Sequence, residues 1–144
     1  MATAPGASGP GLKLRVGIDA VAVERLRRLV EGGDKRQERL FTAGEIEYCR
    51  GKRRRYEHLA ARFAAKEAVL KAFGTGISQR MRWTDVEVVN EQSGRPRIVL
   101  GGAVAAFAER HGLRDLDVSL THTEGFAFAQ ATTLWERRGA CAST

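Results

Sequence analysis

Cysteine is scarce in this chain and occurs at only two distant positions. Of the 144 residues, Cys49 lies in a charged stretch and Cys141 lies near the C-terminal end. This pattern excludes the close spacing of a cysteine zinc site and the dense cysteines of a disulfide-stabilised domain. We therefore expect two unpaired thiols in a protein of a reducing, intracellular compartment.

Long apolar runs are also missing. No segment approaches the roughly 20 apolar residues of a membrane-spanning helix, and the first residues, MATAPGASGPG, lack the basic and then apolar pattern of a secretory signal. The expectation is a cytoplasmic protein without a membrane partner. We predict a flexible tail over residues 1–12, a single domain over residues 13–135 and a polar tail over residues 136–144.

Acidic residues are fewer than basic ones, 17 against 24, so the formal net charge is +7. Such a chain attracts acidic partners, whether nucleic acid, an anionic membrane, a phosphate-rich cofactor or an acidic protein. Aromatic side chains make up only 7% of the residues, whereas a surface that binds unpaired bases needs aromatic side chains beside its basic ones. The composition therefore disfavours nucleic acid without choosing among the other partners.

The first half of the domain predicts one strand and then helices. Residues 12–19, LKLRVGID, alternate as a strand that ends near Asp19, and residues 20–33 have apolar residues at helical spacing before a Gly-Gly stop. A short charged helix follows. Thr42 and Glu45 then match a capping box at the start of another helix.

The second half adds strands to a long helix that ends at Gly74. Residues 83–91 and 97–100 predict a hairpin, residues 101–112 an alanine-rich helix, and residues 117–135 two strands joined by a tight turn. The predicted fold class is therefore α+β, with a small, mostly antiparallel sheet packed on one long helix.

Charged residues interrupt the apolar long helix. From residue 59 to residue 73 nearly every position is apolar except Arg62, Lys66, Glu67 and Lys71, and a buried charge is costly unless it is paired or coordinated. Two interpretations stay open at this point. Glu67 and Lys71, one turn apart, form an ordinary surface ion pair worth a few tenths of a kcal/mol, or they hold a cation and a phosphate.

Asp19 and His122 offer further chemistry at the ends of two predicted strands. Asp19 either caps the next helix or points a carboxylate into a cleft, and His122 is either structural or a phosphate ligand. The segment Gly74–Gly76 is either a helix cap or a turn that lets a ligand approach the backbone. Two carboxylates with basic groups suit Mg²⁺ and phosphates, which indicates phosphoryl-transfer chemistry.

Five segments of the chain resemble one enzyme family in their order and spacing. The segments VGIDAVAVERL, FTAGEIEYC, ARFAAKEAVLKAFGTGI, NEQSGRPRIVL and VSLTHTEGFAFAQATTL are similar to those of holo-acyl-carrier-protein synthases, the short class of 4′-phosphopantetheinyl transferases. The resemblance spans about residues 13–135. These enzymes transfer the phosphopantetheine arm of coenzyme A to a serine of an apo-acyl carrier protein of fatty-acid or polyketide biosynthesis, and they release adenosine 3′,5′-bisphosphate.

The resemblance implies roles for the charged residues of the long helix. Asp19 and Glu67 would hold the catalytic Mg²⁺, and Lys71 would neutralise or protonate the pyrophosphate of coenzyme A. Because a serine hydroxyl is too weakly acidic to attack unaided, Glu67 would act as its base, directly or through a metal-bound water. Lys66 would support the site or form an ion pair. The residues implied in coenzyme A binding are His122, Arg54, Arg62, Phe63, Gly74, Thr75, Gly76 and Pro96.

The resemblance also implies a homotrimer with active sites between adjacent subunits. In such a trimer the turn from Gly94 to Pro96 would reach the adenine side of a neighbour's site. Acyl carrier proteins present an acidic recognition helix, which favours a basic docking surface, although each arginine could equally be ordinary and solvated. The docking residues implied are Arg25, Arg27, Arg28 and Arg36.

The alternative function is a basic, non-catalytic module that binds nucleic acid. It is supported by the net charge and by the segment RGKRRRY at residues 50–56. It gives Asp19 and Glu67 no role. An inactive relative of the transferases is a further alternative, against which the intact Asp19, Glu67, Lys71 and His122 argue.

Overall fold

The structure is a computed structural model that describes residues 11–78 and 80–137. Cys141 and most of the two predicted tails lie outside the described residues. The helices and strands follow in this order: β1 (Leu12–Ala22), α1 (Val23–Val30), α2 (Asp34–Leu40), α3 (Ala43–Arg50), α4 (Arg55–Phe73), a 3₁₀ turn (Trp83–Asp85), β2 (Val86–Asn90), β3 (Pro96–Leu100), α5 (Gly102–Arg110), β4 (Leu113–Thr123) and β5 (Phe126–Glu136).

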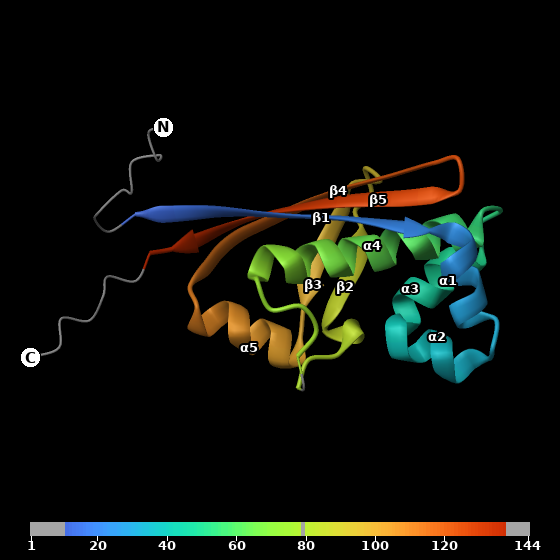
Figure 1. Cartoon of the computed structure of the whole chain (residues 1–144), viewed down its shortest axis with the longest axis horizontal. Coiled ribbons are helices and arrows are strands. Elements are labelled where there is room, and N and C mark those ends of the chain that lie inside the picture. The colour runs from blue at the N-terminus through green and yellow to red at the C-terminus, as the bar shows by residue number, and fades with distance from the viewer. Residues whose placement is uncertain (1–10, 79, 138–144) are drawn as a thin grey trace, which may run out of the picture.

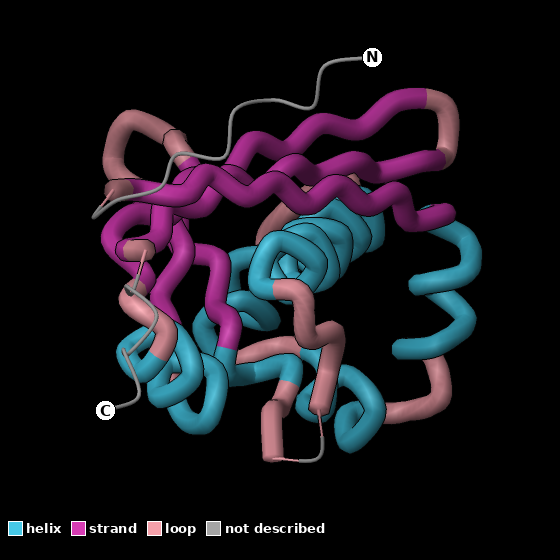
Figure 2. Tube along the Cα trace, turned by 60° about the vertical axis from the view of Figure 1, so that its left-hand side comes forward, coloured by secondary structure: helices cyan, strands magenta, loops and turns pink. Residues whose placement is uncertain are grey.

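The strands form two antiparallel sheets, which confirms the α+β class but corrects the expectation of one sheet. A three-stranded sheet has the order β1-β5-β4, and β2 pairs only with β3. In the hairpin, Val86 and Val88 are buried, and β2 packs on α3 and α4. In Figures 1 and 2 the described helices lie on one face of the three-stranded sheet, with α4 directly beneath it.

Small residues let α4 lie close to this sheet. The side of α4 that meets the sheet carries Ala61, Ala64 and Ala68, and the facing positions of β5 are also alanines, all of them buried. On β1, a Cβ added at Gly17 would come within 1.9 Å of the carbonyl oxygen of Ala68. Gly17 is therefore needed for β1 to reach α4, and this contact brings the end of β1 to the charged side chains of the helix.

Several local predictions are confirmed, whereas three strand boundaries are wrong, among them the start of β4, which lies at Leu113 and not at residue 117. The capping box of Thr42 and Glu45 is present, and Gly74 ends α4 in the left-handed conformation with φ 77°. The first strand continues past its predicted end to Ala22, because its last residues pair with β5 as far as the pair Ala22–Phe126. Residues 83–85 form a 3₁₀ turn instead of the start of β2.

The outer face of the three-stranded sheet carries an exposed apolar row along β1. Its members, Leu12, Leu14, Val16 and Ile18, are each more than half exposed in the single chain, although β-strand residues of this kind usually face a core. Among the described residues no helix covers this face (Figure 1). Nor does the described part of the chain contain a helix long and apolar enough to cross a membrane.

Candidate active site

Asp19 and Lys71 meet where β1 crosses the last turns of α4. The Nζ atom of Lys71 donates to Asp19 Oδ1 at 2.9 Å and to the carbonyl oxygen of Ile18 at 3.0 Å. Lys71 is half exposed, so its ammonium group lies outside the buried face of the helix. Its ion pair is with Asp19 on another element, which differs from the i,i+4 pairing with Glu67 considered from the sequence.

Glu67 lies beside this pair and has a perturbed carboxyl group. Partial burial and the neighbouring carboxyl group of Asp19 raise the pKa of Glu67, while the positive charges of Lys71 and Arg25 oppose the shift. The hydrogen bond with Asp19 in turn raises the pKa of Lys71. The lysine therefore stays protonated at neutral pH, and Glu67 gives up its proton less readily than an ordinary carboxyl group does.

The donor set at Asp19 and Glu67 fits a divalent cation that also binds phosphate. Asp19 Oδ2 is buried and has no hydrogen-bond partner, and a second carboxylate stands next to it. Within residues 11–78 and 80–137 no group of three or more histidine, cysteine or acidic side chains could hold a metal alone. Mg²⁺ typically takes one or two carboxylates with water and substrate phosphate oxygens, so these two residues suffice for it.

Lys66 belongs to a different and closed arrangement. Its fully buried Nζ donates to Glu45 Oε1 at 2.7 Å and to the carbonyl oxygens of Trp83 at 3.0 Å and Val86 at 2.6 Å. Glu45 also accepts bonds from the backbone N–H groups of Thr42 and Val88. Of the two roles considered for Lys66, the structure shows an ion pair that ties α3, α4 and β2 together.

The glycine turn after α4 mainly caps the helix. The amide of Gly74 donates to the carbonyl of Lys71, and the amides of Thr75 and Gly76 both donate to the carbonyl of Leu70. These N–H groups are therefore already used by the helix end. A ligand at this turn would gain from the close approach that glycine permits rather than from free amide donors.

A second group of predicted residues lines a pocket of about 260 Å³ between α4, β4 and the β2–β3 turn. It contains Arg62, Pro96 and His122. Arg62 Nη2 donates to Asn90 Oδ1 at 2.5 Å, and its guanidinium carbon lies 4.2 Å from the ring centroid of Tyr48. Sequence reasoning missed Tyr48 and Asn90, because a residue that holds an arginine in place carries no motif of its own.

His122 also connects this pocket to the start of α4. Its Nδ1 lies 3.2 Å from Glu57 Oε2, and Arg54 Nη1 lies 3.6 Å from the same oxygen. Arg54 and His122 both line a neighbouring pocket of about 220 Å³. Phe63 is separate from these residues, since its ring packs on Trp83 with centroids 5.0 Å apart.

The two groups of residues lie on opposite flanks of α4. Arg62 and Lys71 are separated by about two and a half turns at 3.6 residues per turn, so their side chains leave the helix on opposite sides. Asp19 comes from β1 and His122 from β4, the two outer strands of the sheet. In a single chain the carboxylate group and the arginine pocket therefore do not share one cleft.

The predicted docking arginines are exposed but unequal. Arg27 contacts Glu24 and Glu31, and Arg28 contacts Glu24, so their charges are partly neutralised. Arg25 has no carboxylate within ion-pair distance in the described chain. Its positive charge acts to lower the pKa of Glu67. Arg36, on α2, is also exposed.

Comparison with known proteins shows the class of this fold and site. The family described as the 4′-phosphopantetheinyl transferase superfamily matches residues 15–131. The match covers most of the chain, so the chain belongs to this superfamily.

Individual relatives narrow the class further. The holo-[acyl-carrier-protein] synthase of Geobacter sulfurreducens is 50% identical over 114 residues, which cover 78% of this chain and 90% of the relative. The enzyme of the same name from Solibacter usitatus is 44% identical over 114 residues, covering 78% and 91%. The resemblance inferred from the sequence motifs is thereby confirmed.

Solved structures of such synthases share the fold. The holo-(acyl-carrier-protein) synthase of Bacillus anthracis in complex with coenzyme A (3′,5′-ADP) aligns with a TM-score of 0.70 at 31% identity, over 84% of this chain and 96% of that chain. The Helicobacter pylori synthase in complex with coenzyme A aligns with a TM-score of 0.72 at 28% identity, over 82% and 98%. Both likenesses agree with the α+β fold described above.

Proposed function

We propose that this chain is a holo-acyl-carrier-protein synthase, which transfers 4′-phosphopantetheine from coenzyme A to a serine of an apo-acyl carrier protein and releases adenosine 3′,5′-bisphosphate. The observation that carries the proposal is the cluster of Asp19, Glu67 and Lys71 in a chain of this superfamily. The two solved synthases named above are complexes with coenzyme A, which supports coenzyme A as a substrate here. The catalytic domain would be residues 13–135, flanked by the two tails.

Coenzyme A would be bound through its phosphates by the basic residues of the two pockets. Arg62 is held in place by Asn90 and Tyr48, so little side-chain freedom is lost when it binds a phosphate. Arg54 and His122 supply further positive or hydrogen-bonding groups, and Pro96 with Gly94 would border the adenine. Phe63 and the Gly74–Gly76 turn would line the rest of the cleft.

The transfer step would form a bond between the serine oxygen and the phosphorus of the phosphopantetheine, and break the pyrophosphate bond. Bound Mg²⁺, held by Asp19 and Glu67, would supply charge neutralisation at the pyrophosphate. Glu67 would accept the serine proton, directly or through a metal-bound water, as the general base that a weakly acidic hydroxyl requires. Lys71 stays an ammonium and compensates charge on the departing bisphosphate.

The homotrimer that the family resemblance implies is supported by the separation of the two groups. A phosphate of one coenzyme A molecule can meet both the carboxylates and the arginine pocket only if the two groups come from neighbouring chains. The exposed apolar row along β1 gives such an assembly a surface to bury. The active site would then be complete only in the oligomer.

The carrier protein would dock on α1 and α2 through Arg25, Arg27, Arg28 and Arg36, beside Glu67. Complementary charge would speed the encounter and make it sensitive to salt. Both substrates belong to the cytoplasm, which we propose as the enzyme's location. No observation on the described residues favours nucleic-acid binding over this function.

The test is transfer to a carrier protein, read from the carrier's intact mass. The protein is incubated with an apo-acyl carrier protein, coenzyme A and Mg²⁺, with an EDTA control. A metal-dependent gain of one phosphopantetheinyl group is expected. The absence of a gain with both fatty-acid and polyketide carriers would contradict the proposal.

A Glu67→Gln variant provides the matched control. It keeps the side-chain volume and removes the charge, so the fold should persist while turnover falls by about 10²–10⁴, the range for a general base. Circular dichroism and thermal unfolding check the fold. Near-normal turnover of this variant would exclude the proposed role of Glu67.

A further inference from the structure

A larger pocket, of about 680 Å³, lies between α5 and the segment that leads from the glycine turn to the 3₁₀ turn. None of the residues assigned above to catalysis, coenzyme A or carrier docking lines it. Its volume falls within the roughly 300–1,000 Å³ typical of small-molecule sites. The pocket therefore needs an explanation of its own.

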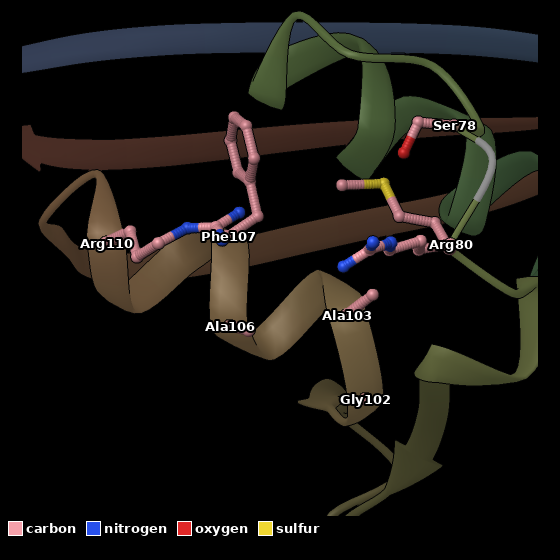
Figure 3. Close-up of a pocket in the computed structure, with 8 residues that line it drawn as sticks. Ser78, Arg80, Gly102, Ala103, Ala106, Phe107 and Arg110 are labelled. Atoms are coloured by element: carbon pink, nitrogen blue, oxygen red, sulfur yellow. The ribbon is translucent and has the colours of Figure 1, made fainter.

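Two arginines face each other across this pocket. Figure 3 shows Arg80 extending from the segment before the 3₁₀ turn and Arg110 from the last turn of α5, with their guanidinium groups directed toward one another. Neither has a carboxylate within ion-pair distance in the described chain, whereas Arg54, Arg95 and Arg114 each contact an acidic side chain. Like charges on one pocket are best stabilised by an anion between them.

The wall between the arginines is apolar. It includes Met81, Ala106 and Phe107, and Ser78 also lines the pocket. The ring of Phe107 already stacks on His111, with centroids 3.9 Å apart, and on Phe73 at 5.9 Å. A nucleobase would have to compete with these rings for the faces of Phe107, whereas a hydrocarbon chain needs only its edge and the alanine and methionine side chains.

We propose that this pocket binds an aliphatic carboxylate of the fatty-acid type. The carboxylate would lie between Arg80 and Arg110, where planar guanidinium groups form charge-assisted hydrogen bonds, and the chain would lie along Met81, Ala106 and Phe107. The inference does not rest on the transferase function, since the pocket shares no residue with the proposed active site.

The pocket nevertheless adjoins the glycine turn. Thr75 Oγ1 lies 3.9 Å from Met81 Sδ. A ligand packed on Met81 would therefore contact a side chain that itself contacts Thr75, one of the residues proposed to line the coenzyme A cleft. Amide signals of Met81, Ala106 and Thr75 should therefore shift together when the pocket fills.

The binding test titrates sodium octanoate into the full-length protein, followed by calorimetry and by amide NMR shifts. Saturable binding of one octanoate per chain is expected. Full burial of one methylene group lowers a dissociation constant roughly fourfold. Because this pocket is open, we expect about half of that free energy, so the dissociation constant should fall about twofold per methylene from hexanoate to decanoate. Neutral octanamide should bind at least about tenfold more weakly, since it loses the charge-assisted bonds.

Three variants and one control locate the site. Arg80→Gln and Arg110→Gln should each weaken octanoate binding about fivefold or more, and Ala106→Trp should abolish it by filling the pocket while both arginines remain. Arg97→Gln removes an exposed arginine on β3, outside the pocket, and should change binding less than about twofold. Melting temperatures check that each variant folds.

Four outcomes would overturn the inference. If Arg97→Gln weakened octanoate binding as much as the pocket variants do, the attraction would be to a basic protein in general. Unchanged octanoate binding in Ala106→Trp, or octanamide binding as tight as that of octanoate, would also contradict the proposal. Tighter binding of octyl phosphate than of octanoate would make a phosphate the proper ligand.

Discussion

Helix α4 carries two lysines that form ion pairs of nearly equal length in opposite surroundings. Lys66 lies 2.7 Å from Glu45, and neither side chain is exposed; Lys71 lies 2.9 Å from Asp19, and the side chain of Lys71 is 54% exposed. In both pairs the carboxylate comes from another element. The pairs therefore differ mainly in what else surrounds them.

The first pair is saturated and the second is not. Lys66 donates to three oxygens, and both oxygens of Glu45 accept from the backbone or the lysine. Asp19 keeps one oxygen without a partner, and Glu67 stands beside it with a raised pKa. A saturated buried pair stabilises one conformation, whereas an open pair leaves groups available for a ligand.

The largest expected effect comes from removing each lysine in turn. Lys66→Met should lower the free energy of unfolding by about 3–5 kcal/mol, because it leaves Glu45 buried without its counter-ion. Lys71→Met should change it by less than about 1 kcal/mol, since the side chain of Lys71 is half exposed and water can replace its ammonium group, while the activity of this variant should be almost lost. Urea unfolding and the carrier mass assay measure the two effects. Equal destabilisation by both variants would break the distinction between the pairs.

The next effect concerns the pKa of Glu67. Asp19→Asn should lower this pKa, because it removes a neighbouring negative charge, whereas Lys71→Met should raise it, because it removes a positive one. Carboxyl ¹³C NMR titration in the absence of divalent cations measures both. A shift in the same direction in the two variants would contradict the assignment.

The same group gives a stability dependence with a definite sign. The folded-state pKa of Glu67 is raised above the ordinary value of 4.5, so its contribution to stability is fully present below that value. The contribution is lost as the pH rises through the folded-state pKa, where the folded form must give up its proton. Asp19→Asn should weaken this dependence.

The smallest effect concerns the arginines of α1 that are proposed to dock the carrier protein near Glu67. Exposed charge pairs contribute about 0.2–1 kcal/mol each, so reversing Arg25 and Arg28 together should raise the KM for the carrier protein roughly three- to tenfold. The KM for coenzyme A should hardly change. Arg25→Glu alone should raise the KM for the carrier protein more than Arg28→Glu alone, because Glu24 already neutralises part of the charge of Arg28. An equal rise in both KM values would refute the docking assignment.

Local patterns in the sequence predicted most of the fold. The capping box at Thr42, the end of α4 at Gly74 and the tight turn between the last two strands depend on residues close in sequence, and all three are confirmed. The extension of β1 to Ala22 and the division into two sheets depend on pairing with β5 and on burial against helices. Such long-range contacts leave no periodicity in the segment itself.

For the site, the sequence identified the charged residues but not their partners. The motifs selected Asp19, Glu67 and Lys71, which the structure brings together. The pairing of Lys66 with Glu45 joins residues from two helices, and the capping-box pattern suggested only one of the roles of Glu45. Tyr48 and Asn90 escaped notice because an aromatic ring and an amide in amphipathic segments look like ordinary surface residues.

The position of the two residue groups on opposite flanks of α4 has a consequence for mixed populations of the enzyme. In the proposed trimer, each active site combines the carboxylates of one chain with the arginine pocket of a neighbouring chain. A chain that lacks Glu67 can still contribute an intact arginine pocket, and a chain that lacks Arg62 can still contribute intact carboxylates. Two kinds of inactive chain, assembled together, would therefore contain some intact sites. Defects on opposite flanks would complement each other, whereas two defects on the same flank would not.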